Sequence, residues 1–194
     1  VCKQFLGQFR MSIASHVISI GGEGSHEGRI RRIQEAMDRK DTVGGIFEVR
    51  VENVPVGLGS YVQPDRRLDA RLAAALMAIP GVKSFEVGLG LGYAEVFGSQ
   101  VHDAIYYSRK EGFYRQSNNA GGIEGGISNG EDIVLRCCMK PIATLLAPLP
   151  SVNITNARPA KAAVERSDIC AVESAGVVAE SACAFVLCRA FLEK

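Results

Sequence analysis

The segment Val172–Leu192 is the strongest constraint on how this chain can fold. Most of its positions are alanine, valine, leucine, cysteine or phenylalanine, and they lie on nearly every face of the helix that the segment predicts. A helix that is apolar on all faces has to be covered on all sides. Two arrangements satisfy this requirement: a central helix of the chain's own core, or a helix shared with a neighbouring subunit.

The composition is that of a globular chain with a substantial core. The 194 residues are 47% hydrophobic and contain no linker, low-complexity tract or clean repeat, so 1–194 is predicted to be a single domain or one large piece of one. Lys and Arg (22) nearly balance Asp and Glu (21), which leaves no overall field to attract nucleic acid or an anionic membrane. No charge-free run of about 18 apolar residues is present, and the N-terminus resembles no targeting peptide. We therefore expect a cytoplasmic protein that binds neither nucleic acid nor membrane.

The apolar periodicity alternates between helix and strand along the chain. In the amphipathic helix predicted at 26–40, Ile30, Ile33 and Met37 share one face and Ser25 can cap the start. Helix pairs that alternate with short sheets predict an α/β (α+β) layered sandwich rather than a barrel or a doubly wound sheet. The predicted helices are 1–9, 26–40, 66–79 and Val172–Leu192, and the predicted strands are Ser12–Ile20, 47–51, Val82–Val87 and 132–138.

Residues 117–131 contain five glycines among amides and hydroxyls, which a packed core would not select. Such a cluster implies turns with positive φ or a close approach of the main chain to another body. Its bare N–H groups could hold a flat or anionic ligand. The spacing matches neither the P-loop nor the dinucleotide-binding fingerprint. A ligand loop and a plain glycine-rich connection are both compatible with these residues.

The cysteines predict no metal site and no catalytic thiol. The six residues, at positions 2, 137, 138, 170, 183 and 188, lack paired zinc-type spacing and have no histidines placed to complete a site. Cys137 and Cys138 should point to opposite faces of a strand. Cys183 and Cys188 lie among apolar residues as small fillers. Only Cys170, near Arg166, has an electropositive neighbour that could activate it.

Several blocks of sequence carry a pattern when they are read in order. The specific ones are Asn118-Asn119-Ala120-Gly121-Gly122-Ile123, Gly125-Gly126-Ile127-Ser128-Asn129-Gly130, Met139-Lys140-Pro141-Ile142-Ala143-Thr144 and Arg166-Ser167-Asp168-Ile169-Cys170-Ala171-Val172. Weaker matches are Ser15-His16-Val17, Leu68-Asp69-Ala70, Gly98-Ser99, His102-Asp103 and Gly176-Val177-Val178-Ala179-Glu180. Together they extend over essentially the whole chain, which resembles the C-terminal part of the chorismate synthase family.

The resemblance implies a fold and an activity. The fold is a layered β-α-β sandwich, with helices packed against antiparallel or mixed sheets. The activity is that of a carbon–oxygen lyase: a 1,4-elimination of phosphate from 5-enolpyruvylshikimate 3-phosphate that gives chorismate, in the shikimate pathway of aromatic amino acid biosynthesis. The reaction requires reduced FMN (FMNH2), although it is redox-neutral overall. The family also implies a homo-oligomer, a tetramer, and it associates NADP with flavin reduction by the protein itself or by a partner.

The resemblance also assigns site residues. The flavin-contacting positions are Pro80, Gly81, Gly125, Lys140, Pro141, Ile142, Ala143, Thr144 and Arg166. Arg166 is also expected to bind the anionic substrate, since its planar guanidinium suits phosphate and carboxylate. Asp168 is the catalytic candidate, with a role in proton handling at the N5 edge of the flavin. From the residues alone, Lys140 would be a solvated lysine at a strand end, and Ser167 and Asp168 could do no more than cap the following helix.

The chain also departs from the family pattern. The Gly-Glu-Ser-His-Gly motif, the second catalytic histidine and the Arg-x-Ser-x-Arg-Glu-Thr segment are upstream motifs that these residues lack. Glu173 stands where the family usually has proline, and it could weaken an anion site or favour the helix N-terminus. His16 and His102 are expected to make structural hydrogen bonds. Two hypotheses follow: a fragment of an FMN-dependent lyase, inactive alone, or a catalytically incomplete module for flavin binding or oligomerisation.

Overall fold

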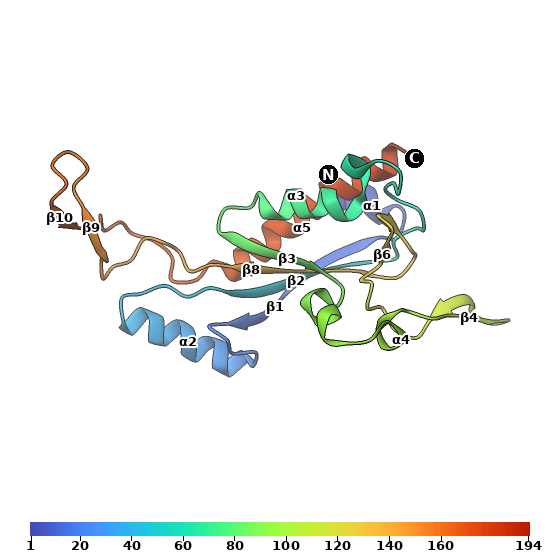
Figure 1. Ribbon diagram of the computed structural model, residues 1–194, viewed down its shortest axis with the longest axis horizontal. Coiled ribbons are helices and arrows are strands. Elements are labelled where there is room, and N and C mark those ends of the chain that lie inside the picture. The colour runs from blue at the N-terminus through green and yellow to red at the C-terminus, as the bar shows by residue number, and fades with distance from the viewer.

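The computed structural model describes residues 1–194 and has a four-stranded antiparallel sheet at its centre (Figure 1). The strands are β1 (Ser12–Ile20), β2 (Gly45–Glu52), β3 (Val82–Val87) and β8 (Ile133–Met139). Their order across the sheet is β1-β2-β8-β3. β8 therefore lies between β2 and β3 although it is distant from both in sequence, so the sheet is complete only when this late segment inserts.

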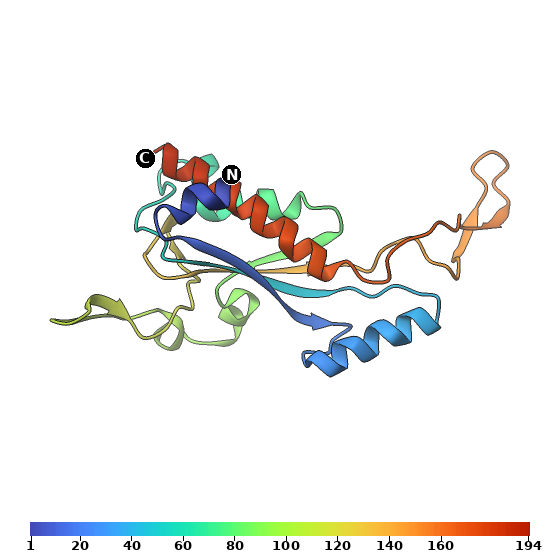
Figure 2. The ribbon, with the colours of Figure 1, turned by 180° about the vertical axis from the view of Figure 1, so that it is seen from behind.

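Three helices cover one face of the sheet: α1 (Cys2–Gly7), α3 (Leu68–Met77) and α5 (Val172–Leu192), as Figure 2 shows from behind. Alternate positions of β2 point toward them, and Phe47, Val49 and Val51 are fully buried. The intervening Glu48 and Arg50 point to the opposite face. One cluster of 26 buried residues forms the core between the sheet and the helices.

The apolar helix α5 is covered on one side only. Ala175, Ala179, Cys183 and Leu187 recur at helical spacing and are buried against the sheet. On the other side the large side chains of Val177, Val178, Phe185 and Leu192 are more than half exposed. The first arrangement, in which the chain's own core covers every side of α5, is therefore wrong for these residues, whereas a helix shared with a neighbouring subunit stays a prediction. α5 has the length and hydropathy of a membrane span, but a core helix passes the same test, and 44% of its most apolar window is buried inside the structure.

Shorter elements surround this body. α2 (His26–Asp38) connects β1 to β2, while η1 (Pro64–Arg66) precedes α3. η2 (Gly90–Glu95) and α4 (Gly98–Val101) follow β3. The remaining strands form three hairpins: β4 (Ile105–Ser108) with β5 (Gly112–Arg115), β6 (Ile123–Glu124) with β7 (Ile127–Ser128), and β9 (Pro150–Val152) with β10 (Pro159–Lys161). The β9–β10 hairpin projects far from the body in Figure 1.

The predicted α+β class is confirmed, and these residues supply one sheet and one helical layer of the sandwich. Ser25 caps α2 as expected, because its Oγ accepts a hydrogen bond of 3.1 Å from the Gly28 N–H. The predicted apolar face of this helix is wrong in part. Only Ile33 packs against the core, whereas Ile30 and Met37 are at least half exposed, because α2 lies beyond the end of the sheet (Figure 1).

Candidate functional site

Three segments that are far apart in sequence meet at one end of the sheet. Lys140, directly after β8, donates its backbone N–H to the carbonyl of Gly81 at 2.9 Å. Gly81 has a φ of +87°, which only glycine adopts without strain, and a Cβ there would also press on the Met139 side chain. Ser167 donates its hydroxyl to the carbonyl of Thr144 at 2.8 Å. Residues 80–81, 140–144 and 166–168 therefore share one edge of the fold.

Residues 42–44, just before β2, hold this edge together. The Thr42 hydroxyl donates to the carbonyl of Ile142 at 2.6 Å, and the Val43 N–H donates to the carbonyl of Ile169 at 2.9 Å. A Cβ on Gly44 would overlap the carbonyl oxygen of Met139, so only glycine fits beside the end of β8. The strap formed by residues 42–44 was not predicted from the sequence. Its one signal is a glycine pair before a strand, which also marks many ordinary turns.

The helix-cap interpretation of Ser167 and Asp168 is wrong. α5 begins at Val172, and its N-cap residue is Ala171, which makes no side-chain capping bond. The Ser167 hydroxyl instead bonds the carbonyl of Thr144. The carboxylate of Asp168 is exposed and forms no hydrogen bond or ion pair with the rest of the chain. It is therefore available to a ligand at this edge.

The charges at the edge are also unpaired within the chain. Lys140 and Arg166 are both exposed and belong to none of the ion pairs of the structure. Thr144, which lies between them in the sequence, is half-buried. Glu173 lies in the first turn of α5, where a negative charge is favourable to the helix. Burial raises the pKa of the Cys170 thiol, and Glu173 adds to the effect, so Arg166 does not activate this cysteine.

The start of the glycine-rich segment is anchored by a buried carboxylate. Asp103 accepts hydrogen bonds from the Ser117 hydroxyl at 2.6 Å and from the backbone N–H groups of Asn119 at 2.9 Å and Ala120 at 2.8 Å. Gly121 crosses Gly88 so closely that a Cβ on it would overlap the Gly88 backbone. The close approach that the glycines predicted is therefore to the chain's own backbone. For residues 117–122 the structure supports a plain connection.

Gly125 does not lie with the other predicted site residues. It occupies the tip of the β6–β7 hairpin, where it is exposed and has nothing within 4 Å of an added Cβ. The hairpin adjoins the start of β8, whereas Lys140 follows its end (Figure 1). Seven residues of strand span about 20 Å. Only a second chain could bring a Gly125 to the edge where Lys140 and Arg166 lie.

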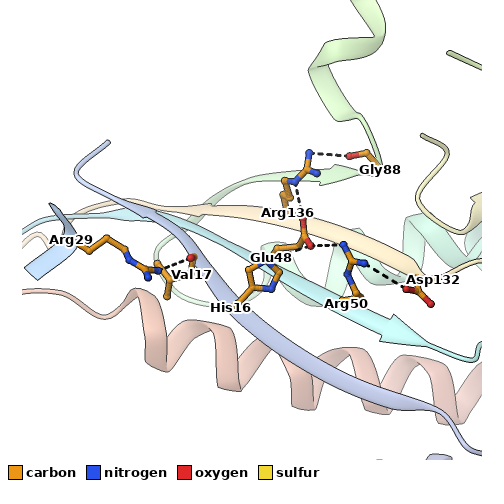
Figure 3. A network of polar contacts seen from close by, with 8 residues as sticks. All are labelled: His16, Val17, Arg29, Glu48, Arg50, Gly88, Asp132 and Arg136. Carbon is orange, nitrogen blue, oxygen red and sulfur yellow. Dashed lines mark hydrogen bonds and ion pairs between the residues drawn. The ribbon is translucent and has the colours of Figure 1, made fainter. Parts of the chain in front are cut away.

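A polar cluster on the open face of the sheet was not predicted (Figure 3). Glu48, only 3% exposed, accepts a hydrogen bond from Arg136 Nε at 2.9 Å and lies 3.4 Å from a terminal guanidinium nitrogen of Arg50. His16 Nε2 lies 3.6 Å from the same carboxylate, so this histidine has a structural partner. The alternation of charged and apolar residues within the strands gave the signal, but the strand register was needed to pair them.

The anchoring by Asp103 predicts a pH-dependent loop. Burial alone would raise the pKa of Asp103, but the bonds from Ser117, Ala120 and Asn119 outweigh it and hold the pKa below its ordinary value of 3.8. Because the pKa is lower in the folded chain, this stabilisation is present above pH 3.8 and lost as the pH falls below it. The protection of the Asn119 and Ala120 amides against hydrogen exchange, relative to the intrinsic exchange rate at each pH, should fall over that acid range.

The matched variant is Asp103→Asn. The two oxygens of Asp103 accept from the N–H groups of Asn119 and Ala120, so in either orientation of the amide its NH2 group faces one of these donors instead of accepting from it. We therefore expect a loss of about 1 to 3 kcal/mol in the free energy of unfolding at neutral pH. The difference from wild type should shrink in acid, where Asp103 itself is protonated. Equal urea stability of the two proteins at neutral pH would contradict the anchoring role.

Comparisons with known proteins agree with this architecture. Residues 1–192 match the family model described as chorismate synthase. The chain is 57% identical over 172 residues to the chorismate synthase of Desulforamulus reducens, which covers 89% of the chain and 44% of that protein. It is 51% identical over all 194 residues to the chorismate synthase of Thermoanaerobacter pseudethanolicus, 55% of which is covered.

A solved structure described as "Crystal Structure of Chorismate Synthase" superposes with a TM-score of 0.82 at 37% identity, over 99% of the chain and 60% of that structure. The chain thus spans about half the length of the curated relatives that it matches. Because the family model matches nearly all its residues and these relatives are about half identical to it, the chain belongs to the chorismate synthase family.

Proposed function

We propose that this chain provides the flavin-facing part of an enzyme that converts 5-enolpyruvylshikimate 3-phosphate to chorismate by an FMN-dependent 1,4-elimination of phosphate. The observation that carries the proposal is the convergence of residues 80–81, 140–144 and 166–168 on one edge. Their conformation is fixed by backbone hydrogen bonds and by the strap of residues 42–44, while the charged side chains remain free.

The donor set of this edge fits FMN. Lys140 and Arg166 are exposed cations with no ion-pair partner, which suits a phosphate, and Thr144 adds a hydroxyl. Pro141 restricts the backbone beside Lys140, and the bare turn at Gly81 allows a flat ring to approach the main chain. When bound, reduced FMN supplies the electron-rich ring on which the redox-neutral elimination depends.

The roles of the chain's own residues follow from their chemistry. Arg166 binds the phosphate or carboxylate of the substrate through its planar guanidinium. Asp168, two residues further on, holds or accepts a proton at the flavin edge, because its free carboxylate is the unpaired acid of this segment. Ser167 positions both neighbours by fixing the backbone to Thr144.

The enzyme is proposed to act as a cytoplasmic homotetramer, with NADP serving flavin reduction on this protein or on a partner. Gly125 would contact flavin only from a second chain, since it lies at the opposite end of β8 from Lys140. The second candidate is a catalytically incomplete module of the same fold, which binds flavin or oligomerises without turnover. Chorismate formation by this chain alone, compared with a version extended to the relatives' full length, separates the two.

Lys140→Ala is expected to weaken FMN binding by about 1.5 to 3 kcal/mol, because it removes one charge-assisted contact to the cofactor. A fluorescence titration of FMN measures the change. The control is Lys110→Ala, which removes an exposed lysine near the tip of the β4–β5 hairpin, away from the edge. Unchanged affinity in Lys140→Ala would remove this residue from the site.

A further inference from the structure

A polar cleft lies at the end of α5 that is farther from residues 166–168. It has a volume of about 220 Å³ and opens between the last turn of α5, the loop of residues 57–60 and the segment that forms η1 and the start of α3. Figure 1 shows this end of α5, next to the C-terminus, beside the chain that leads into α3. Because α5 has 21 residues and spans about 30 Å, the cleft is separate from the edge where Lys140 and Arg166 lie.

The cleft carries an excess of positive charge. Three cationic side chains line it, those of Arg66, Arg71 and Lys194, and Glu193 is the only carboxylate among its lining residues. Arg66 belongs to no ion pair and is exposed. The Lys194 ammonium also has no carboxylate partner and donates to the carbonyl of Val56 at 2.8 Å. Three cations therefore share one carboxylate.

Glu193 does not repel an anion from the cleft, because two arginines already bind it. Its carboxylate accepts from Arg71 Nη1 at 2.6 Å and from Arg189 Nε at 2.8 Å. These hydrogen bonds hold the pKa of Glu193 below its ordinary value of 4.5, so it stays ionised and bound to both arginines at neutral pH. Arg189 lies in the last turn of α5, where a cation also offsets the partial negative charge of the helix end. The two arginines thus balance the carboxylate and the helix end, which leaves Arg66 and Lys194 uncompensated.

The lining also contains hydrogen-bond donors that the chain does not use. The Arg71 side chain is only 12% exposed and is oriented by Glu193 and by the carbonyl of Asp65, which accepts from its Nε at 3.0 Å. Its Nη2 makes no hydrogen bond within the chain and is not buried. The Ser60 hydroxyl accepts from two backbone N–H groups at 3.2 and 3.4 Å, so its own proton is free to be donated. A guanidinium nitrogen and a hydroxyl are therefore available to a ligand.

We infer that this cleft is a binding site for a phosphate group, carried by a small ester or present as the free ion. Guanidinium, ammonium and hydroxyl groups are the donors that bind phosphate oxygens, and the planar guanidinium groups of Arg66 and Arg71 suit them well. The cleft has the volume of about seven water molecules, which leaves room for a short organic group beside the phosphate. A Cβ on Gly57 would lie 2.8 Å from the Lys194 ammonium nitrogen, so the bare backbone there lets this cation reach the lining. The site is independent of the proposed elimination, and neither FMN nor turnover enters its test.

NMR titration of the isotope-labelled chain, without flavin, tests the assignment. The probe is glycerol 3-phosphate, a monoester that carries close to two negative charges at about pH 7.5. At low salt it should shift the backbone amides of Gly57, Gly59 and Ser60 with a Kd on the order of 1 mM, and sodium chloride should weaken the binding. Inorganic phosphate should shift the same amides. Tighter binding of glycerol 3-phosphate identifies an ester as the ligand, and equal binding identifies the free ion.

Arg66→Gln should raise the Kd at least about tenfold, because it removes a charged donor whose side chain makes no hydrogen bond or ion pair within the chain. Arg71→Lys keeps the charge but loses the planar fork, and it should also weaken binding. The matched control is Arg109→Gln at the turn of the β4–β5 hairpin. It removes the same charge away from the cleft and should leave the Kd unchanged.

Circular dichroism melting confirms that each variant folds, and Arg66→Gln alone decides the matter if Arg71→Lys does not fold. Three results would overturn the assignment: no amide shifts at about 20 mM of either probe, shifts centred on residues 140–144 instead of residues 57–60, or equal Kd values for Arg66→Gln and Arg109→Gln.

Discussion

Asp168→Asn is expected to lower chorismate formation by about 10²- to 10⁴-fold, the usual loss when a general acid or base is removed. Asparagine keeps the shape of the side chain and some of its hydrogen bonding but cannot hold the proton. The measurement requires a protein extended upstream to the full length of the relatives. FMN affinity should change little, because Lys140 and Arg166 keep their charges.

The structure sharpens this prediction by excluding the structural alternative. The N-cap residue of α5 is Ala171, and the exposed carboxylate of Asp168 forms no hydrogen bond or ion pair within the chain, so Asp168→Asn should change the free energy of unfolding by no more than about 0.5 kcal/mol. Asp65→Asn, at an exposed carboxylate of η1, is the matched control and should leave both turnover and stability unchanged. Wild-type turnover in Asp168→Asn would eliminate the catalytic assignment.

Gly121→Ala is expected to be one of the most destabilising single substitutions in the chain, by about 2 to 5 kcal/mol in urea unfolding. Two costs combine. Its φ of +61° is unfavourable for alanine by about 1 to 2 kcal/mol, and the added methyl group meets the backbone of Gly88, which adds an overpacking cost of about 1 to 3 kcal/mol. The backbone of Gly88 cannot move aside without disturbing the end of β3.

Gly125→Ala separates these two costs. Gly125 has nearly the same φ, +59°, but its Cβ would meet nothing within 4 Å. It should therefore lose only the conformational part, about 1 to 2 kcal/mol. Similar losses in the two variants would show that the crossing of residues 88 and 121 does not constrain the fold.

The local elements could be predicted from the sequence because they depend on periodicity and on nearby residues. The strands Ser12–Ile20 and Val82–Val87 and the helix Val172–Leu192 occur with the predicted bounds, and Ser25 caps α2 as its position before the helix indicates. The family resemblance was also visible in short blocks whose residues are contiguous. Exposure was predicted less well: Ile30 and Met37 follow a helical repeat, yet α2 has no neighbour on that side to cover them.

The sequence by itself determined where the four strands of the main sheet and the helices α1, α2, α3 and α5 lie, which residues of β2 alternate between the two faces of the sheet, and which family the motifs indicate. Only the tertiary structure decided which distant segments meet. The order β1-β2-β8-β3 places residue 140 beside Gly81 and sends Gly125 to the opposite end, and the same order brings His16, Glu48 and Arg136 together on the open face. The physical reason is that local pattern fixes the backbone conformation of each element, whereas strand register and loop crossings depend on contacts between residues far apart in the chain.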